Sequence, residues 1–425
     1  MMEESPSPFA RLAWAHPPQP MQSAVSLASR LAALNGRPMP NFLREMGIQP
    51  NDIDRGRSAA VHRLADLAGA DPDDIIHATP VRSEDEAFMH LCGERLRRLS
   101  VHRTYFRYCP ACVTEDVATF DGPLAARPWL RTEWLVAHVR SCERHGLHLA
   151  NASPERRRFE APDFNGTMVE ELGRLEDIRA DCPSASPSPF QRWLLGRLRG
   201  KRDATNWLDG LELYVAVGAC EAFGISALYP PRFRISTLSE SDRAMAADEG
   251  YAHASDGPAS LEALLERLNA QQTSTKGVWA PRDTFGYGYV ILERDIGDTA
   301  WDPVRDVVAN FAMREMPLKA GAKVLGRTVE RQMVHTIRTA ASASGAHALT
   351  MRRLFERENL GADAIAAGLM DHRVTVDAER IEATVRELKG ALSTPKVQKL
   401  TGFPLIWLRT IIADGRLPAV TGSED

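Results

Sequence analysis

Apolar residues recur with helical spacing along most of this 425-residue chain. In segment 23–36 they fall on one face of a helix with about 3.6 residues per turn, at Val25, Leu27, Leu31 and Leu34. Asn35 and Gly36 then provide a C-terminal stop for that helix. The same pattern predicts further short helices over 39–47 and 59–68.

Helical patterning resumes after Phe190. Thr237 and Glu240 form a capping-box signature ahead of a helix over 241–250. Segment 258–271 reads as an amphipathic helix with one leucine face, formed by Leu261, Leu264, Leu265 and Leu268. The sequence shows neither a sustained two-residue alternation nor a fixed-period repeat, so we predict a mainly α fold.

The pattern weakens over 151–189, where segment 182–189 alternates proline and serine and is predicted to be a linker. At this length two or three domains are expected. We predict a helical and zinc-binding domain over 20–150, followed by an irregular region with a linker over 151–189. A helical middle domain would span 190–310, a helix-turn-helix region 311–375, and a second helix-turn-helix candidate 376–425.

Composition is that of an ordinary globular protein, with 44% apolar and 25% charged residues. The first 22 residues lack a basic and apolar leader, and no apolar run approaches the roughly 20 residues that span a bilayer. We therefore expect a cytoplasmic, nucleoid-associated protein. Because the net charge is −4, any nucleic-acid binding must come from local basic patches.

Two pairs of candidate metal ligands share the same internal spacing. Cys109 and Cys112 form one pair, and Cys142 and His145 form the other. Together they make a Cys3His set, which fills the tetrahedral shell of Zn²⁺ and leaves no position for a reacting water. We therefore predict one structural zinc ion. The alternative is that Cys109 and Cys112 are a redox pair or buried thiols.

The interval between the two pairs contains Trp129 and Trp134, and segment 129–139 suggests a helix that returns the second pair to the first. Three nearby histidines read as packing or surface residues rather than ligands: His102, His138 and His148. The predicted fold is thus an N-terminal helical and zinc-finger module followed by helical domains.

Segment 334–358 has the spacing of a helix-turn-helix. Ala341 is small enough for a close helix crossing, and Gly345 lies where the turn needs a positive φ. Met351 and Leu354 would face inward. The candidate DNA contacts on this unit are His347, Thr350, Arg352, Arg353 and Arg357.

The charge distribution supports a nucleic-acid role for this region. Between positions 313 and 359 there are nine lysines and arginines and four acids, a net charge of +5. The remainder of the chain is therefore acidic overall, so the basic charge is concentrated here.

A second helix-turn-helix candidate spans 392–419. Ser393 would cap its first helix, Gly402 would lie in the turn, and Leu408 and Ile411 would face inward. Segment 415–418 would begin a short wing. The candidate contacts are Arg409, Thr410 and Arg416. For both candidates the alternative is an ordinary helical hairpin.

Motifs for catalysis are weak. Segment 321–328 resembles a phosphate-binding loop, but Arg327 replaces its lysine and no buried strand precedes it. Four acids form a run that a solvated helix face explains better than a two-metal nuclease: Asp295, Asp298, Asp302 and Asp306. We therefore expect no enzymatic activity.

Segments 108–116, 129–134 and 142–147, together with the opening helix over 26–36, resemble the TniQ family of transposon target-selection proteins, which includes TnsD-like members. The resemblance covers about residues 20–150. It implies a non-catalytic adaptor that recognises a site on double-stranded DNA, or a DNA-bound guide-RNA effector complex. The adaptor then recruits an AAA+ ATPase and transposase of the same element.

The resemblance also assigns the zinc ion to the Cys109, Cys112, Cys142 and His145 set. One departure is that many members carry another Cys-x-x-Cys soon after this set, whereas segment 151–158 lacks one. Two other functions stay open: a zinc-containing helix-turn-helix transcription regulator and, less favoured, a zinc metalloenzyme with an open ligand position. Whether the protein is a monomer or a homodimer also stays open.

Overall fold

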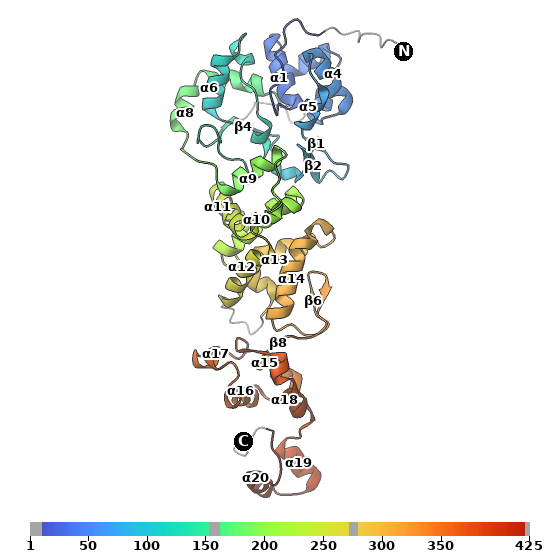
Figure 1. The fold of residues 1–425 in the computed structure, drawn as a ribbon, viewed down its shortest axis with the longest axis vertical. Helices are drawn as coiled ribbons and strands as arrows, with labels where there is room; N and C mark the ends of the chain where they lie inside the picture. The colour runs from blue at the N-terminus through green and yellow to red at the C-terminus, as the bar shows by residue number, and fades with distance from the viewer. Residues whose placement is uncertain (1–10, 153–161, 272–278, 421–425) are drawn as a thin grey trace, which may run out of the picture. The chain divides into compact units, whose positions relative to one another are not determined.

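The computed structural model describes residues 11–152, 162–271 and 279–420. Helices dominate these residues, which confirms the mainly α prediction (Figure 1). The chain divides into two compact units, one made of the residues up to Gly224 with Ser239–Gly257, and the other of Ile225–Leu238 with the residues from Pro258 onward. The division falls within helix α10 (Leu213–Leu228).

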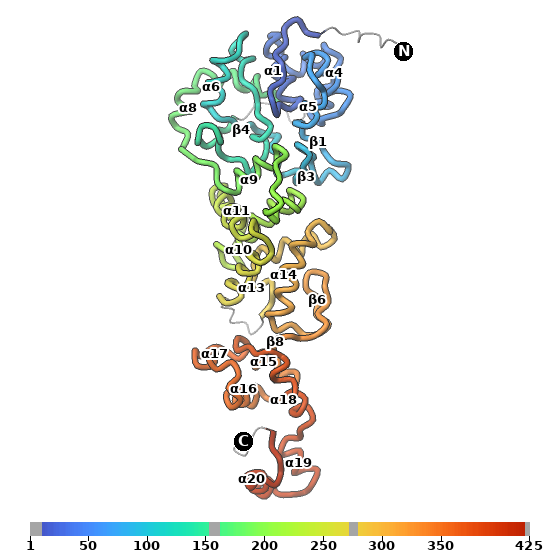
Figure 2. The backbone as a smooth tube through the Cα atoms, in the orientation of Figure 1, coloured from blue at the N-terminus to red at the C-terminus, as the bar shows by residue number. Residues whose placement is uncertain are grey.

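A cluster of short helices opens the first unit (Figure 2). It comprises α1 (Ala24–Leu34), α2 (Met39–Glu45), α3 (Pro50–Asp54), α4 (Ser58–Ala68) and α5 (Pro72–His77). The Ser23 hydroxyl caps α1 by accepting a hydrogen bond from the Ser26 amide. The predicted opening helix is confirmed, but α1 is buried on nearly all sides because later segments cover its second face.

A small antiparallel sheet follows this cluster and was not predicted. Its strands are β1 (Val81–Arg82), β2 (Phe88–Leu91) and β3 (Glu94–Arg97), in that order. Cys92 and Gly93 join β2 to β3 with φ angles of 55° and 75°, the geometry of a two-residue hairpin turn. The short strands lack the alternation that would have marked them in the sequence.

The region of the predicted metal ligands is built from short elements. They are the 3₁₀ turns η1 (Arg98–Ser100), η2 (Leu124–Ala126) and η3 (Thr132–Leu135), the paired strands β4 (Phe106–Tyr108) and β5 (Ala150–Ala152), and helix α6 (Pro110–Thr119). The helix expected over 129–139 is wrong, because only η3 forms there. Bridges from Arg131 to Gln22 and from Val136 to Val101 hold the flanking backbone extended.

The interval 151–189, expected to be irregular, contains two helices, α7 (Phe164–Leu172) and α8 (Leu175–Asp181). Helix α7 packs against α1, and α8 packs against α6. The proline- and serine-rich segment after α8 is not a free linker: the Ala185 amide donates to the Gly146 carbonyl at 2.8 Å, and Ser184 bridges Leu147. Tertiary hydrogen bonds thus fix a segment whose own composition favours a linker.

Helix α9 (Pro189–Leu198) and the 3₁₀ turn η4 (Trp207–Gly210) are tied to the sheet by a buried arginine. The Arg197 guanidinium donates to Glu94 at 2.8 Å and to Asp209 at 3.2 Å. Because a buried cation is costly without partners, this pairing links the two elements specifically.

Helix α11 (Glu240–Ala254) crosses α10 at unusually short range. Its cap is Ser239 with Asp242, two residues after the predicted Thr237 and Glu240 pair, because Thr237 belongs to the 3₁₀ turn η5 (Ile235–Thr237). A Cβ atom on Gly250 would lie 1.8 Å from the Cys220 carbonyl oxygen. The crossing therefore requires glycine at this position.

The second unit begins with helices that pack around an apolar core. They are α12 (Pro258–Ala270), α13 (Pro281–Arg294) and α14 (Asp302–Glu315), with the 3₁₀ turn η6 (Thr299–Trp301). The predicted leucine face of α12 is buried, as expected. The next elements are the paired strands β6 (Lys323–Val324) and β7 (Arg327–Thr328). The segment that resembled a phosphate-binding loop is thus a hairpin, and Arg327 pairs with Asp306.

The last part of the second unit holds both helix-turn-helix candidates. Its elements are β8 (Val334–Thr336), α15 (Ile337–Ser344), α16 (Ala348–Arg357), α17 (Ala362–Ala366), β9 (Thr375–Asp377), α18 (Ala378–Gly390), α19 (Thr394–Thr401) and α20 (Leu405–Ala413). Among the described residues, no helix is both long enough and apolar enough to cross a membrane.

The α10–α11 crossing gives a first prediction. Replacing Gly250 with alanine forces the helices apart and should lower the free energy of unfolding by about 3 kcal/mol, the upper part of the range for overpacked cores. Chemical denaturation followed by circular dichroism measures the change. The control is Gly210→Ala, where a Cβ meets no atom within 4 Å. Equal stability of the two variants would contradict the close crossing.

Candidate metal centre and nucleic-acid interface

The first ligand pair lies where strand β4 runs into helix α6. Cys109 is the N-cap residue of α6, and Pro110 at the first helical position fixes the entry of the chain. Cys112 lies in the first turn of the same helix. Both side chains are buried, with 0% and 4% of their surface exposed, so the local sequence directs both thiols to one interior point.

The second pair lies on a tight turn. The Gly146 amide donates to the Cys142 carbonyl at 2.9 Å, and the Cys142 amide donates to the Leu147 carbonyl at 2.8 Å. Gly146 has a φ of 60°, a left-handed conformation that glycine adopts without strain. The turn thus returns His145 toward Cys142.

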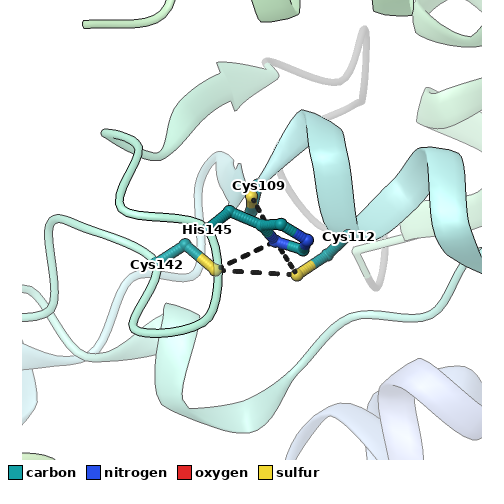
Figure 3. Close-up of side chains that lie close together, drawn as sticks. All are labelled: Cys109, Cys112, Cys142 and His145. Carbon is teal, nitrogen blue, oxygen red and sulfur yellow. Dashed lines mark hydrogen bonds between the residues drawn. The ribbon is translucent and has the colours of Figure 1, made fainter. Parts of the chain in front are cut away.

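The four predicted ligands meet at one point (Figure 3). The Nδ1 atom of His145 lies 3.5 Å from the sulfur of Cys109, 3.2 Å from that of Cys112 and 3.6 Å from that of Cys142. All four ligand atoms lie within 4.8 Å of one another. Tetrahedral Zn²⁺ with its usual bond lengths separates its ligands by about 3.5–3.8 Å. The residues therefore fit a four-coordinate metal ion.

The electrostatics of the cluster favour a cation. Hydrogen bonds from Cys109 and Cys112 lower the pKa of Cys142, so a thiolate is stabilised there. A thiolate is the form of cysteine that binds metals. The pKa of Cys112, in contrast, is raised by its hydrogen bonds with Cys109 and Cys142. Outside the cluster, burial raises the pKa of Cys92 to about 12 and also raises the pKa of Cys220, so these two remain thiols.

Glu115 completes the surroundings of the cluster and was missed in the sequence. Its carboxylate accepts a hydrogen bond from the Nε2 atom of His145 at 3.0 Å and also pairs with Arg144 at 2.9 Å. A carboxylate on the outer nitrogen orients a metal-bound imidazole and raises its basicity. The available signal was the spacing of Cys112 and Glu115, since residues three apart share one helix face.

An ion pair joins α6 to the interval between the two ligand pairs. Arg131 donates to the buried carboxylate of Asp116 on α6 at 2.8 Å. Its guanidinium also lies 4.2 Å from the ring of Trp129 and 4.8 Å from the ring of Trp134. The ion pair of Arg131 with Asp116, together with the stacking of Arg131 on the two tryptophan rings, holds this segment in place, and no helix forms there.

The three histidines that we did not expect to be ligands lie outside the cluster. Among the described residues, the cluster is the only group of three or more cysteine, histidine or acidic side chains placed so that it could hold a metal ion. His102 bonds to the Tyr105 hydroxyl at 3.0 Å, and burial lowers its pKa to about 4. His138 lies 3.6 Å from the carboxylate of Glu221, and His148 is exposed. Their interpretation as packing or surface residues is therefore consistent with their positions.

The first helix-turn-helix candidate forms two helices joined at a left-handed glycine. Gly345 has a φ of 76° between α15 and α16, as the turn requires. Met351 and Leu354 are buried as predicted, at 0% and 2% exposure. Helix α18 packs on α15, and the strands β8 and β9 pair beside them. The pair is thus part of a small core rather than an isolated hairpin.

The side chains proposed to contact DNA from this helix pair differ in their hydrogen-bond partners and in their exposure. His347 is exposed, but its Nδ1 atom caps α16 by accepting from the Leu349 amide at 3.2 Å. Arg352 is held by Asp371 at 2.7 Å and by Glu356 at 3.2 Å. Arg357 donates to Glu358 at 3.0 Å. Arg353 is exposed, and Thr350 is half-buried.

The second candidate is a smaller pair. Gly402 joins α19 to α20 with a φ of 74°, and Leu408 is buried as predicted. Ser393 occupies the cap position without a side-chain hydrogen bond, and Ile411 is only half-buried. Within the described residues after α20 no strand forms, so the predicted wing is not seen.

The proposed contacts on the second pair all lie at the surface: Arg409, Thr410 and Arg416. The Thr410 hydroxyl donates to the Ile406 carbonyl at 3.0 Å. The sequence did not anticipate an exposed apolar group on the same pair, formed by Leu400, Phe403, Ile406 and Trp407.

The TniQ family model matches residues 13–149, about a third of the chain. This segment belongs to the TniQ family. No curated protein matches the chain. The matched TniQ segment begins before α1 and ends just after the turn that carries Cys142 and His145, so it contains all four candidate ligands.

Hydrogen bonds join the opening helix of the matched segment to the interval between the ligand pairs. The Ser26 hydroxyl of α1 accepts a hydrogen bond from the Leu130 amide at 3.0 Å. The fully buried Arg30 donates to the Ala126 carbonyl at 3.2 Å. The first helix is therefore joined to the interval between the ligand pairs, and the TniQ segment is one folded structure.

The carboxylate of Glu115 gives a second prediction. Glu115→Gln keeps the shape of the side chain but weakens the partner of His145, so metal affinity should fall about 10-fold to 100-fold. Competition with a chromophoric chelator measures this affinity in the full chain. The matched control is Glu143→Gln, whose carboxylate pairs with Arg199 rather than with a ligand. An unchanged affinity for Glu115→Gln would contradict its orienting role.

Proposed function

We propose that this chain is a non-catalytic DNA-targeting adaptor of a transposition system. The observation that carries the proposal is the TniQ match over residues 13–149, since membership is consistent with a transposition-associated targeting protein. The adaptor would recognise a target site, or a DNA-bound guide-RNA effector complex. It would recruit an AAA+ ATPase and transposase of the same element.

The metal in this proposal is a single structural zinc ion. Three sulfurs and one nitrogen are the donor set that closed zinc sites use, and four protein ligands leave no place for a reacting water. When bound, zinc would stabilise the fold by joining the two turns. The residues around it then act by position: Glu115 orients His145, and Asp116 with Arg131 fixes α6 against the interval.

The DNA-binding part of the proposal rests on the second unit. Its two helix pairs carry exposed basic side chains, of which Arg353 and Arg409 lie on the second helix of each pair. The second helix is the one that enters the major groove in helix-turn-helix proteins. Segment 313–359 has a net charge of +5, and segment 392–420 has a net charge of +3 from four cations and one acid; the interval between them, 360–391, has a net charge of −2. Such patches attract phosphate backbones.

The contacts of the candidate side chains within the protein narrow the set that we propose to contact DNA. Arg352 is half-buried and paired with Asp371 on a later segment, and the His347 ring caps α16, so we assign these two side chains to shaping the helix. Arg353, Arg357, Arg409 and Arg416 are the cations that the proposal places against DNA, together with the hydroxyls of Thr350 and Thr410. Each arginine can contact phosphates or a guanine edge.

Salt-dependent binding gives a third prediction. Fluorescence anisotropy of a labelled duplex should show an affinity that falls steeply between about 50 and 200 mM salt, because neutralised phosphates release counterions. Arg353→Gln and Arg409→Gln should each weaken binding about 3-fold to 10-fold and make the salt dependence shallower.

The control for this measurement is Arg179→Gln, an exposed arginine of α8 in the other unit. A flat salt dependence, or equal losses in all three variants, would contradict DNA binding by the helix pairs. Addition of the element's ATPase distinguishes the adaptor from a transcription regulator. The adaptor should retain the ATPase on the labelled duplex, whereas a regulator would bind DNA without it.

A further inference from the structure

The second helix of each helix-turn-helix pair carries a large apolar residue on its surface. Leu349 is the second residue of α16 and is 62% exposed, and Ile406 is the second residue of α20 and is 72% exposed. A single exposed apolar residue on a protein surface is ordinary. Two of them at matching places, on the helices that we place in the major groove, call for an explanation.

The two positions also match relative to the turn of their helix pair. Leu349 and Ile406 each follow by four residues the left-handed glycine that joins the two helices. Two residues further along each helix, Met351 and Leu408 are buried, with 0% and 3% of their surface exposed. Because two residues span about 200° around a helix, Leu349 and Ile406 point away from the core of their pair.

The neighbours of these two residues on the outer helix faces are side chains that we propose to contact DNA. Arg353 follows Leu349 by four residues, and Arg409 and Thr410 follow Ile406 by three and four, so each set shares one helix face. All five side chains are exposed. In helix-turn-helix proteins the N-terminal residues of the second helix contact base edges. Both apolar residues therefore lie where base edges would be met.

The charge of the two helix pairs favours DNA over a second copy of the chain as the occupant of these faces. Helix α16 contains three arginines and one glutamate, and segment 392–420 has a net charge of +3. Two facing copies would bring like charges together, whereas the phosphates of DNA are complementary to them. A polyanion with apolar groups on its inner surface suits both features.

The major groove of DNA presents one methyl group among its base edges. It is the C5-methyl of thymine, whereas the groups that distinguish the other bases there are hydrogen-bond donors and acceptors. An apolar side chain that covers a donor or an acceptor removes its hydrogen bond with water without replacing it, which is unfavourable. Leu349 and Ile406 therefore suit thymine better than any other base edge.

On the basis of the proposed DNA-binding function, we propose that Ile406 and Leu349 contact the C5-methyl groups of thymines in the major groove. The two helix pairs then favour A·T base pairs beneath the first turns of α16 and α20. In this arrangement the arginines supply affinity through phosphates, and the apolar residues supply sequence preference. The preference comes from neutral contacts, so it is separable from the salt-dependent part of binding.

Fluorescence anisotropy of the full chain with two labelled duplexes of equal length tests this proposal. One duplex alternates A and T, and the other has uracil in place of every thymine, which removes the methyl groups and keeps the base pairing. Every register of the first duplex presents methyl groups in the major groove, so the target sequence need not be known. The thymine duplex should bind more tightly, by about 4-fold for each methyl group that is buried.

Variants of exposed residues assign the preference for thymine to particular side chains. Ile406→Ala and Leu349→Ala should each reduce this preference and leave the salt dependence unchanged, because neither removes a charge. Arg409→Gln should do the reverse: it should weaken binding of both duplexes by the same factor and keep the preference. Val169→Ala, at an exposed apolar position of α7 in the other unit, should change neither quantity.

The outcomes distinguish failure of this inference from failure of the proposed function. Absence of salt-dependent binding to either duplex would contradict both. Salt-dependent binding of equal strength to the two duplexes would overturn this inference alone, as would a preference for thymine that persists in the double variant. Equal affinities together with loss of the ATPase from the duplex in Ile406→Ala would also overturn it, and would place Ile406 and the exposed Trp407 in a protein-binding surface.

Discussion

Three cysteine sulfurs and one imidazole nitrogen lie within 4.8 Å of one another, and the TniQ segment depends on this convergence. Thiolates at such distances repel each other unless a cation lies between them. The convergence joins the β4–α6 corner to the Cys142–His145 turn, and β4 pairs with β5 on either side of it. One interaction therefore fixes the two ends of the interval that also contacts α1.

The meeting of these four side chains could be predicted from the sequence because it depends on the spacing of residues within two short segments. The spacing of Cys109 and Cys112, repeated by Cys142 and His145, is enough to identify the ligand set. Segment 129–139 could not be predicted in the same way. Its backbone follows the ion pair of Arg131 with Asp116 and the bridges to Gln22 and Val101, and these contacts override its helical pattern. The same cause explains why segment 182–189 is held in place rather than free.

In the helix pairs, too, features set by neighbouring residues could be predicted from the sequence, whereas contacts with distant segments could not. Gly345 and Gly402 were predicted from turn chemistry, and both adopt the left-handed conformation. Arg352 pairs with Asp371, which lies on a later segment, so the pattern of α16 alone could not show that this arginine is part of an ion pair. Local spacing identifies elements and ligands, whereas the surroundings of each charge require the fold.

Hydrogen exchange of the full chain before and after removal of metal by a chelator tests the central claim most directly. A structural metal contributes its binding free energy to folding, on the order of 10 kcal/mol in small zinc modules. We predict that amides of 106–152 lose protection on chelation, while those of α15, α16 and α18 keep theirs. Unchanged protection around Cys109 and Cys142 would contradict the claim that a metal ion holds the TniQ segment together.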